Sequence, residues 1–219
     1  MSRADEIRAN VEAVEQRIAA ACERAGRNRA DVRLVAVTKT FPAADVELAI
    51  AAGMTEVGEN KVQEARDKKP SVATSAQWHL IGHLQSNKAK DAVRLFDVIQ
   101  TVDSFELAER LGRAAEAAGK RQEVLLQVNI GREPQKSGAQ PDDVAQLVKR
   151  IAAIASIHLN GLMTIPPLGD AASYFREMRA MRDDLGLAEL SMGMTDDFES
   201  AIEHGATIVR IGRAIFGSR

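Results

Sequence analysis

Short apolar runs alternate with amphipathic helical stretches along most of this 219-residue chain. Eight runs have the length and composition of buried parallel strands: 33–38, 55–58, 78–82, 97–101, 123–129, 157–162, 189–192 and 207–211. Helical periodicity fills the intervals between them, at about 43–52, 60–68, 87–94, 104–118, 141–154, 171–185 and 196–204. Eight strand–helix units of this size predict an α/β fold, a single closed (β/α)8 (TIM) barrel.

An extra N-terminal helix is predicted over residues 3–25, where apolar side chains recur at helical spacing and Gly26 follows as a stop. Four other helices should end at the glycines at positions 53, 119, 186 and 205. A doubly wound open sheet is the alternative fold, but no run is followed by the G-x-G-x-x-G turn of its dinucleotide-binding form. We find no linker, so we expect one domain over residues 1–219.

Composition argues against several classes of function. The formal net charge is −2 and aromatic residues make up 4% of the chain, so neither a basic field nor stacking platforms for nucleic acid are present. Cys22 is the only cysteine, which excludes an internal disulfide and a cysteine-rich metal site. The first residues lack an apolar leader, and no run is long enough to cross a membrane. We therefore expect a cytoplasmic protein with no nucleic-acid or membrane partner.

A lysine follows the first apolar run, at the end of a strand that should be buried on both faces. The run at 34–37 leads through Thr38 into Lys39 before the chain breaks at Pro42. Barrels of this kind place their sites at the carboxyl ends of the strands, where a partly desolvated lysine can form a Schiff base. The alternative is a lysine whose stem packs while its ammonium group reaches water.

Glycine and hydroxyl residues gather at the seventh and eighth runs, where many barrels bind phosphate. Gly193 and Gly212 allow backbone N–H groups to approach an anion closely. Three hydroxyl groups can add donors, those of Ser191, Thr195 and Thr207. We place the anion near backbone 192–193 and 212–213, because the acidic side chains at 196 and 197 would repel it farther along. The alternative is that the glycines serve only tight turns.

The Lys39 amine, the phosphate cup and Arg210 together fit pyridoxal 5′-phosphate (PLP), which carries an aldehyde, a phosphate and a ring nitrogen. An arginine cannot readily accept the proton of that nitrogen, so the ring would stay neutral and be a weak electron sink. Further predicted contacts at the strand ends are Asn60, His79, Met163 and Arg213. A barrel that binds another phosphorylated metabolite without a covalent bond stays open as an alternative.

A metal centre is not supported by the sequence. His79 and His83 have the spacing of a helical zinc pair, but they straddle a strand and a turn, and no glutamate of an HExxH motif lies between them.

Stretches along nearly the whole chain resemble the pyridoxal phosphate homeostasis protein family. They are AVTKTFP (36–42), GENKVQE (58–64), WHLIGHLQSNK (78–88), QVNIGREPQKSG (127–138), GLMTIP (161–166) and LSMGMTDDFESAIEHGATIVRIGRAIFG (190–217). The resemblance implies a barrel of the fold type III PLP proteins, related to the N-terminal domain of alanine racemase. It also implies that Lys39 carries PLP as an internal aldimine and that Arg210 faces the ring nitrogen.

Three positions depart from the family pattern. Members often have serine where Thr195 stands, a Ser-Thr pair at 206–207 where this chain has Ala-Thr, and threonine where Arg213 stands. These changes remove a hydroxyl and add a charge near the expected phosphate. The prediction for this cup therefore rests on the backbone of Gly212 and Arg213 more than on any side chain.

The resemblance implies a carrier and buffer that binds PLP and passes it to apo forms of PLP-dependent enzymes. Alanine racemase uses a tyrosine base opposite its lysine, whereas the only tyrosine here is Tyr174, in the helical stretch 171–185. We expect no catalytic residue, a monomer, and a role in vitamin B6 homeostasis, with a weak amino-acid racemase as the alternative. Lys136, in the loop 131–138, is the candidate for a transient second acceptor during transfer.

Overall fold

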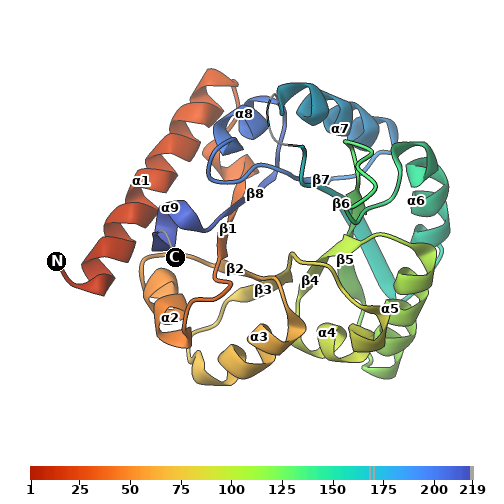
Figure 1. The fold of residues 1–219 in the computed structure, drawn as a ribbon, viewed down its shortest axis with the longest axis horizontal. Helices are drawn as coiled ribbons and strands as arrows, with labels where there is room; N and C mark the ends of the chain where they lie inside the picture. The colour runs from red at the N-terminus through yellow and green to blue at the C-terminus, as the bar shows by residue number, and fades with distance from the viewer. Residues whose placement is uncertain (168, 170, 218–219) are drawn as a thin grey trace.

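The computed structural model describes residues 1–167, 169 and 171–217 and shows a closed barrel of eight parallel strands (Figure 1). The strands are β1 (Arg33–Val37), β2 (Glu56–Glu59), β3 (Gln77–Leu80), β4 (Val98–Val102), β5 (Gln122–Val128), β6 (Ile157–Thr164), β7 (Glu189–Ser191) and β8 (Ile208–Ile211). Each pairs with the next, and β1 closes the ring by pairing with β8, in a register that sets Val35 against Arg210. The predicted (β/α)8 barrel is confirmed, and the open-sheet alternative is wrong.

Helices surround the barrel and alternate with its strands (Figure 1). They are α1 (Arg3–Arg24), α2 (Ala43–Ala51), α3 (Val62–Lys68), α4 (Ala89–Leu95), α5 (Phe105–Ala117), α6 (Val144–Ala152), α7 (Ala172–Asp184), α8 (Phe198–Glu203) and α9 (Arg213–Phe216). The glycines predicted to end helices do so in left-handed backbone, as at Gly119 and Gly186, where φ is +65° and +63°. No helix among the described residues is long and apolar enough to cross a membrane.

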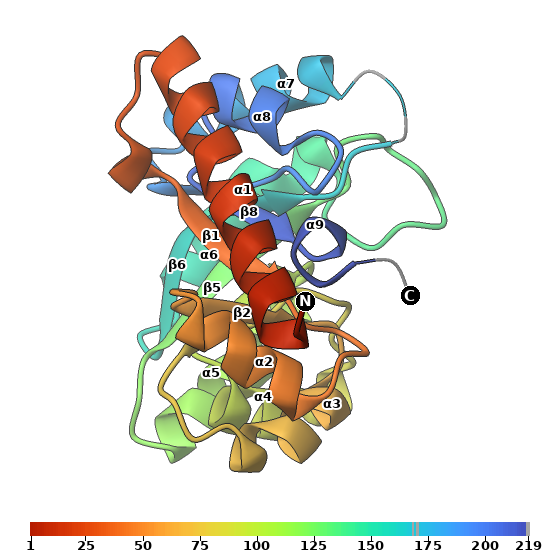
Figure 2. The ribbon, with the colours of Figure 1, turned by 90° about the vertical axis from the view of Figure 1, so that its left-hand side faces the viewer.

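The predicted N-terminal helix, α1, packs across the junction between the first and last units of the barrel (Figure 2). Ser2 caps its start in a reciprocal pair of hydrogen bonds with Asp5. Its apolar stripe is buried: Ile7, Val11, Val14 and Ile18. Side chains of α1 also reach the C-terminal segment, since Asn10 donates a hydrogen bond to the carbonyl oxygen of Ile215 at 2.9 Å.

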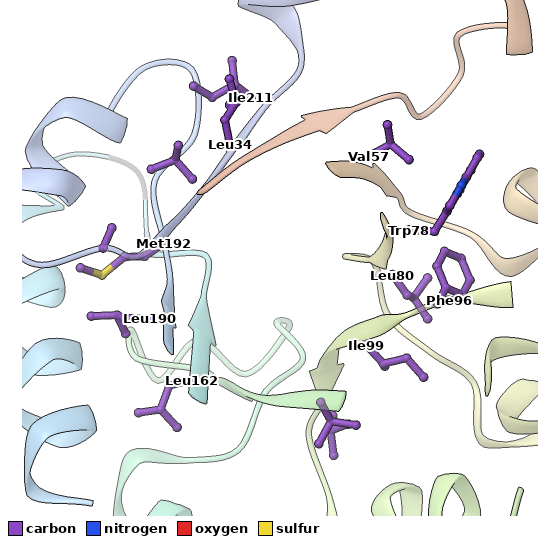
Figure 3. Close-up of a cluster of buried hydrophobic side chains, with 14 of the residues drawn as sticks. Leu34, Val57, Trp78, Leu80, Phe96, Ile99, Leu162, Leu190, Met192 and Ile211 are labelled. Atoms are coloured by element: carbon purple, nitrogen blue, oxygen red, sulfur yellow. The ribbon is translucent and has the colours of Figure 1, made fainter. Parts of the chain in front are cut away.

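The main apolar core is the layer between the strands and the surrounding helices, and it includes all four of these α1 side chains. Figure 3 shows part of this layer, with Trp78 beside Phe96 on one side of the barrel and Leu162 beside Leu190 on the other. A second, small apolar cluster contains Val35, Leu125, Met163 and Ile208. Buried polar side chains also lie along the strands, among them His79 and Gln100. This polar interior supports the floor of the pocket described below.

Candidate functional site

A pocket of about 730 Å³ opens at the carboxyl ends of the strands. Its wall includes Val37 from β1, Gln127 and Val128 from β5, and residues of the loops that follow the strands. Six of the residues predicted from the sequence line it: Lys39, Asn60, Thr195, Arg210, Gly212 and Arg213. The fold therefore brings the lysine of the first strand and the arginine of the last strand to one cavity.

Lys39 is half-buried in the turn that follows β1. The turn is tight, since Thr40 adopts a φ of +68°, a conformation uncommon for residues other than glycine. Two contacts from α3 hold it: Nζ of Lys68 donates to the carbonyl oxygen of Thr38 at 2.8 Å, and the N–H of Thr40 donates to Oε2 of Glu64 at 2.9 Å. The backbone on both sides of Lys39 is thus fixed by charged side chains of one helix.

A buried carboxylate lies behind this turn. Oε1 of Glu59 accepts hydrogen bonds from the Thr38 hydroxyl at 2.6 Å and from Nζ of Lys68 at 2.7 Å. Burial raises the pKa of Glu59 to about 7, although Lys68 and Thr38 act in the opposite direction. The group therefore titrates near neutral pH next to the segment that carries Lys39.

Arg210 rises from β8 into the floor of the pocket and is only 3% exposed. Its Nη1 donates to Oγ of Ser191 at 2.6 Å, and its Nη2 donates to the carbonyl oxygen of Thr164 at 2.8 Å. Burial lowers the pKa of Arg210 to about 10, so it keeps its charge at neutral pH. In the described part of the chain no carboxylate forms an ion pair with it. A buried cation of this kind favours an electron-rich partner from the pocket.

The end of β8 packs closely on the end of β1. A Cβ atom at Gly212 would lie 3.1 Å from the carbonyl oxygen of Val37 and 3.3 Å from its Cβ, so glycine permits this approach. The carbonyl oxygen of Gly212 accepts from the N–H of Ile215 at 2.9 Å as α9 begins. Arg213, at the mouth of the pocket, forms an ion pair with Asp196. The Arg213 side chain, which the sequence predicted near the phosphate, is therefore already paired with the Asp196 carboxylate.

Three predicted residues lie within the barrel rather than on the pocket wall. Ser191 is buried and accepts the hydrogen bond from Arg210. His79 is buried, with Nδ1 2.9 Å from Nε2 of Gln100. Met163 belongs to the small apolar cluster with Val35 and its neighbours. None of the three is among the residues that line the pocket, and only Ser191 bonds to one of them, Arg210.

Two further predicted residues contact parts of the fold outside the pocket. A Cβ atom at Gly193, whose φ is +93°, would lie 2.6 Å from Cβ of Ala201, so this glycine allows α8 to pack. Thr207 precedes β8, at the end of the strand opposite to the pocket. Its hydroxyl donates to the Glu189 carboxylate and accepts from the N–H of Leu190 at 2.8 Å. We therefore leave Thr207 out of the phosphate site proposed below.

The structure adds His83 to the site and places Lys136, the predicted second acceptor, on the same pocket wall. Nδ1 of His83 lies 3.2 Å from Oγ of Ser137, and Nζ of Lys136 lies 2.5 Å from Oε2 of Glu133. The sequence predicted Lys136 in a glycine-flanked loop, but no sequence pattern predicted that His83 would line the same cavity. No group of three or more metal-binding side chains occurs among the described residues.

The fold and the pocket define a class of protein: parallel β/α barrels with a lysine just after the first strand. The protein-family description "Alanine racemase, N-terminal domain" matches residues 5–219. The pyridoxal phosphate homeostasis protein of Pseudomonas aeruginosa is 42% identical over 217 residues, which cover 96% of this chain and 94% of that protein. This chain therefore belongs to the pyridoxal phosphate homeostasis protein family, as its sequence motifs predicted.

Two solved structures agree with this assignment. A protein from Bifidobacterium adolescentis, described as unknown, has a TM-score of 0.91 and 40% identity, covering 98% of this chain and 96% of its own. PipY of Synechococcus elongatus, solved with PLP bound, has a TM-score of 0.80 and 39% identity, covering 85% of this chain and 93% of its own.

Proposed function

We propose that this protein binds PLP in the pocket, buffers it and passes it on, without catalytic turnover, as part of vitamin B6 homeostasis. The observation that carries the proposal is the placement of Lys39 and the buried, positively charged Arg210 on the wall of one pocket. The names of the relatives and the PLP in the PipY structure support it.

The donor set of the pocket fits PLP. The primary amine of Lys39 suits an aldehyde, to which it would join as a Schiff base. Arg210 can only donate hydrogen bonds, so it suits an unprotonated ring nitrogen. We assign the phosphate to the backbone of Gly212 and Arg213, with Thr195 and Asn60 as further contacts. PLP supplies a reactive carbonyl that takes up amines reversibly.

Catalysis at Cα of an amino acid needs a base on the side of the substrate opposite the lysine. Tyr174 lies on α7 and is not among the residues that line the pocket. His83 and Lys136 do line it, which keeps weak racemase activity as the second candidate function. Lys136 contacts both Glu133 and, at 3.3 Å, the carbonyl oxygen of Pro166. We propose that Lys136 is a transient second acceptor of PLP during transfer.

Apo forms of PLP-dependent enzymes are the proposed recipients. We propose that residues 1–219 act as one domain and as a monomer. A reducing cytoplasm is the proposed compartment, because the single cysteine, Cys22, is a buried free thiol.

Covalent labelling tests the proposal. The purified protein loaded with PLP should absorb visible light, and borohydride should fix the pyridoxyl group on Lys39, as mass mapping of peptides would show. Lys39→Ala should abolish the label, while Lys90→Ala, which removes an exposed lysine of α4, should leave it unchanged. A label found mainly on Lys136, or a loaded protein that stays colourless, would contradict the assignment.

A further inference from the structure

A continuous series of buried polar contacts runs down from the pocket floor through the barrel. Nη1 of Arg210 donates to Oγ of Ser191 at 2.6 Å, and that hydroxyl donates across the barrel to Oε1 of Gln100 on β4 at 2.7 Å. Nε2 of Gln100 then lies 2.9 Å from Nδ1 of His79 on β3. Nε2 of His79 lies 3.0 Å from Oε2 of Glu56 on β2. Ser191, Gln100 and His79 are fully buried.

The donors in this series all point the same way. An amide has one accepting and one donating end, so when Oε1 of Gln100 accepts from Ser191, its Nε2 must donate to His79. Nδ1 of His79 is then the acceptor, and its Nε2 carries the hydrogen that faces Glu56. The hydrogen bonds begin on the guanidinium of Arg210 and end on the imidazole of His79, and each of them polarises the next. The Glu56 carboxylate lies close to the far side of that imidazole, without the geometry of a hydrogen bond.

The lower end of the series is anchored by further charges. Oε1 of Glu56 lies 3.6 Å from Nη1 of Arg33, and Nη2 of Arg33 lies 3.2 Å from Oε1 of Glu189. Thr207 donates to the other oxygen of Glu189. The carboxylate beside His79 therefore faces the Arg33 cation, which Glu56 shares with Glu189.

We propose that His79 and Gln100 are positioning residues for Arg210, and through it for the electronic state of the bound pyridine ring. His79 fixes which end of the Gln100 amide faces Ser191. Gln100 in turn takes the Ser191 hydrogen, which leaves the Ser191 oxygen free to accept from Arg210. Without the acceptor at position 79, the amide can turn over and present a second donor to Ser191. The part that concerns the ring rests on the proposed PLP site, whereas the part that concerns Arg210 does not.

The test compares His79→Leu, which cuts the series, with His79→Gln, which keeps an acceptor toward Gln100 and a donor toward Glu56. Leu125→Ala is the matched control, because it opens the small apolar cluster without touching a polar contact. The first readout is the side-chain ¹⁵N–¹H signal of Arg210 in protein without PLP, assigned by its loss in Arg210→Lys. The second is the absorption maximum and the release rate of bound PLP.

We expect His79→Leu to shift or broaden the Arg210 signal, to move the absorption maximum and to speed PLP release about tenfold, the effect of losing one well-placed buried hydrogen bond. His79→Gln should restore all three, and Leu125→Ala should change none. If His79→Leu does not fold, Gln100→Met is tested instead, because it removes the hydrogen-bonding residue next to Ser191. We expect the same changes in this variant. An unchanged Arg210 signal in the variant that folds would overturn the inference. If the wild type fails to take up PLP, the proposed function is wrong. The Arg210 signal still tests the inference that His79 and Gln100 position Arg210.

Discussion

Nζ of the half-buried Lys68 lies 2.7 Å from Oε1 of the buried Glu59, behind the turn that carries Lys39. Lys68 also binds the carbonyl oxygen of Thr38, so one ammonium group joins α3, the end of β2 and the end of β1. The position of the Lys39 backbone therefore depends on a carboxyl group that titrates near neutral pH.

Glu59→Gln should flatten the pH dependence of stability between about pH 4.5 and 7. Burial raises the pKa of Glu59 from 4.5 to about 7, so in this window the folded protein binds more protons than the unfolded chain. The stabilising contribution is full below the lower value and is lost as pH rises through the upper one, a change of about 3 kcal/mol. Urea unfolding at both ends of the window measures it. Glu116→Gln, at an exposed glutamate of α5, is the control, and an equal pH slope in wild type and Glu59→Gln would refute the prediction.

Arg210→Glu should alter the absorption spectrum of bound PLP without creating an efficient racemase. A carboxylate can accept a proton shared with the ring nitrogen, which arginine cannot, but the variant supplies no base on the opposite side of the substrate. Losing one acid–base partner typically lowers a rate by about 10²–10⁴-fold. The measurements are racemisation and solvent deuterium incorporation at Cα of an amino acid. Ordinary enzyme rates in the wild type would support the racemase instead.

Gly212→Val should weaken PLP retention strongly, and Gly212→Ala should do so mildly. A single Cβ already approaches the carbonyl oxygen of Val37 at 3.1 Å, and the branched side chain adds atoms where β1 and β8 meet. If the phosphate lies at this backbone, the affinity for pyridoxal, which lacks it, should fall less than the affinity for PLP. Equal losses for both ligands would show that the phosphate binds elsewhere.

Thr207→Ala should leave PLP affinity unchanged and reduce stability. Its hydroxyl bonds to Glu189 and to the N–H of Leu190, so its removal leaves a buried donor without a partner, at a cost of about 1–3 kcal/mol. Thermal unfolding measures the loss, and a PLP titration checks the affinity. A weaker affinity for PLP, with stability unchanged, would return Thr207 to the phosphate site.

The sequence predicts this fold well because parallel strands buried on both faces form continuous apolar runs, and the helices between them end at glycines. The eight predicted runs match the strands to within two residues at each end. The helix α9 was not predicted, since its four residues are too few to show a periodicity.

The candidate site is harder to predict than the fold. Lys39 and Arg210 could be assigned because each stands at a strand end or on a short strand as an isolated charge. Gln100 and Lys68 could not, because one is a polar residue within an apolar run and the other resembles any solvated helix lysine. Their roles depend on barrel closure, which brings β4 opposite β7 and turns α3 toward the end of β1. Thr207 was misplaced for a simpler reason: it begins a run, and the first residue of a parallel strand lies at the end away from the site.

The packing of α1 also has a consequence for protein synthesis. This helix is made before the strands, yet it packs on α8 and α9 as well as on α2, and the guanidinium of Arg17 lies 4.5 Å from the ring centre of Phe198. Until residues 198–216 have been made, α1 therefore lacks its two largest packing partners, α8 and α9. The ring of strands closes only when residues 208–211 pair with β1. Completion of the barrel and full burial of α1 therefore both require residues 198–216, which include α8, β8 and α9.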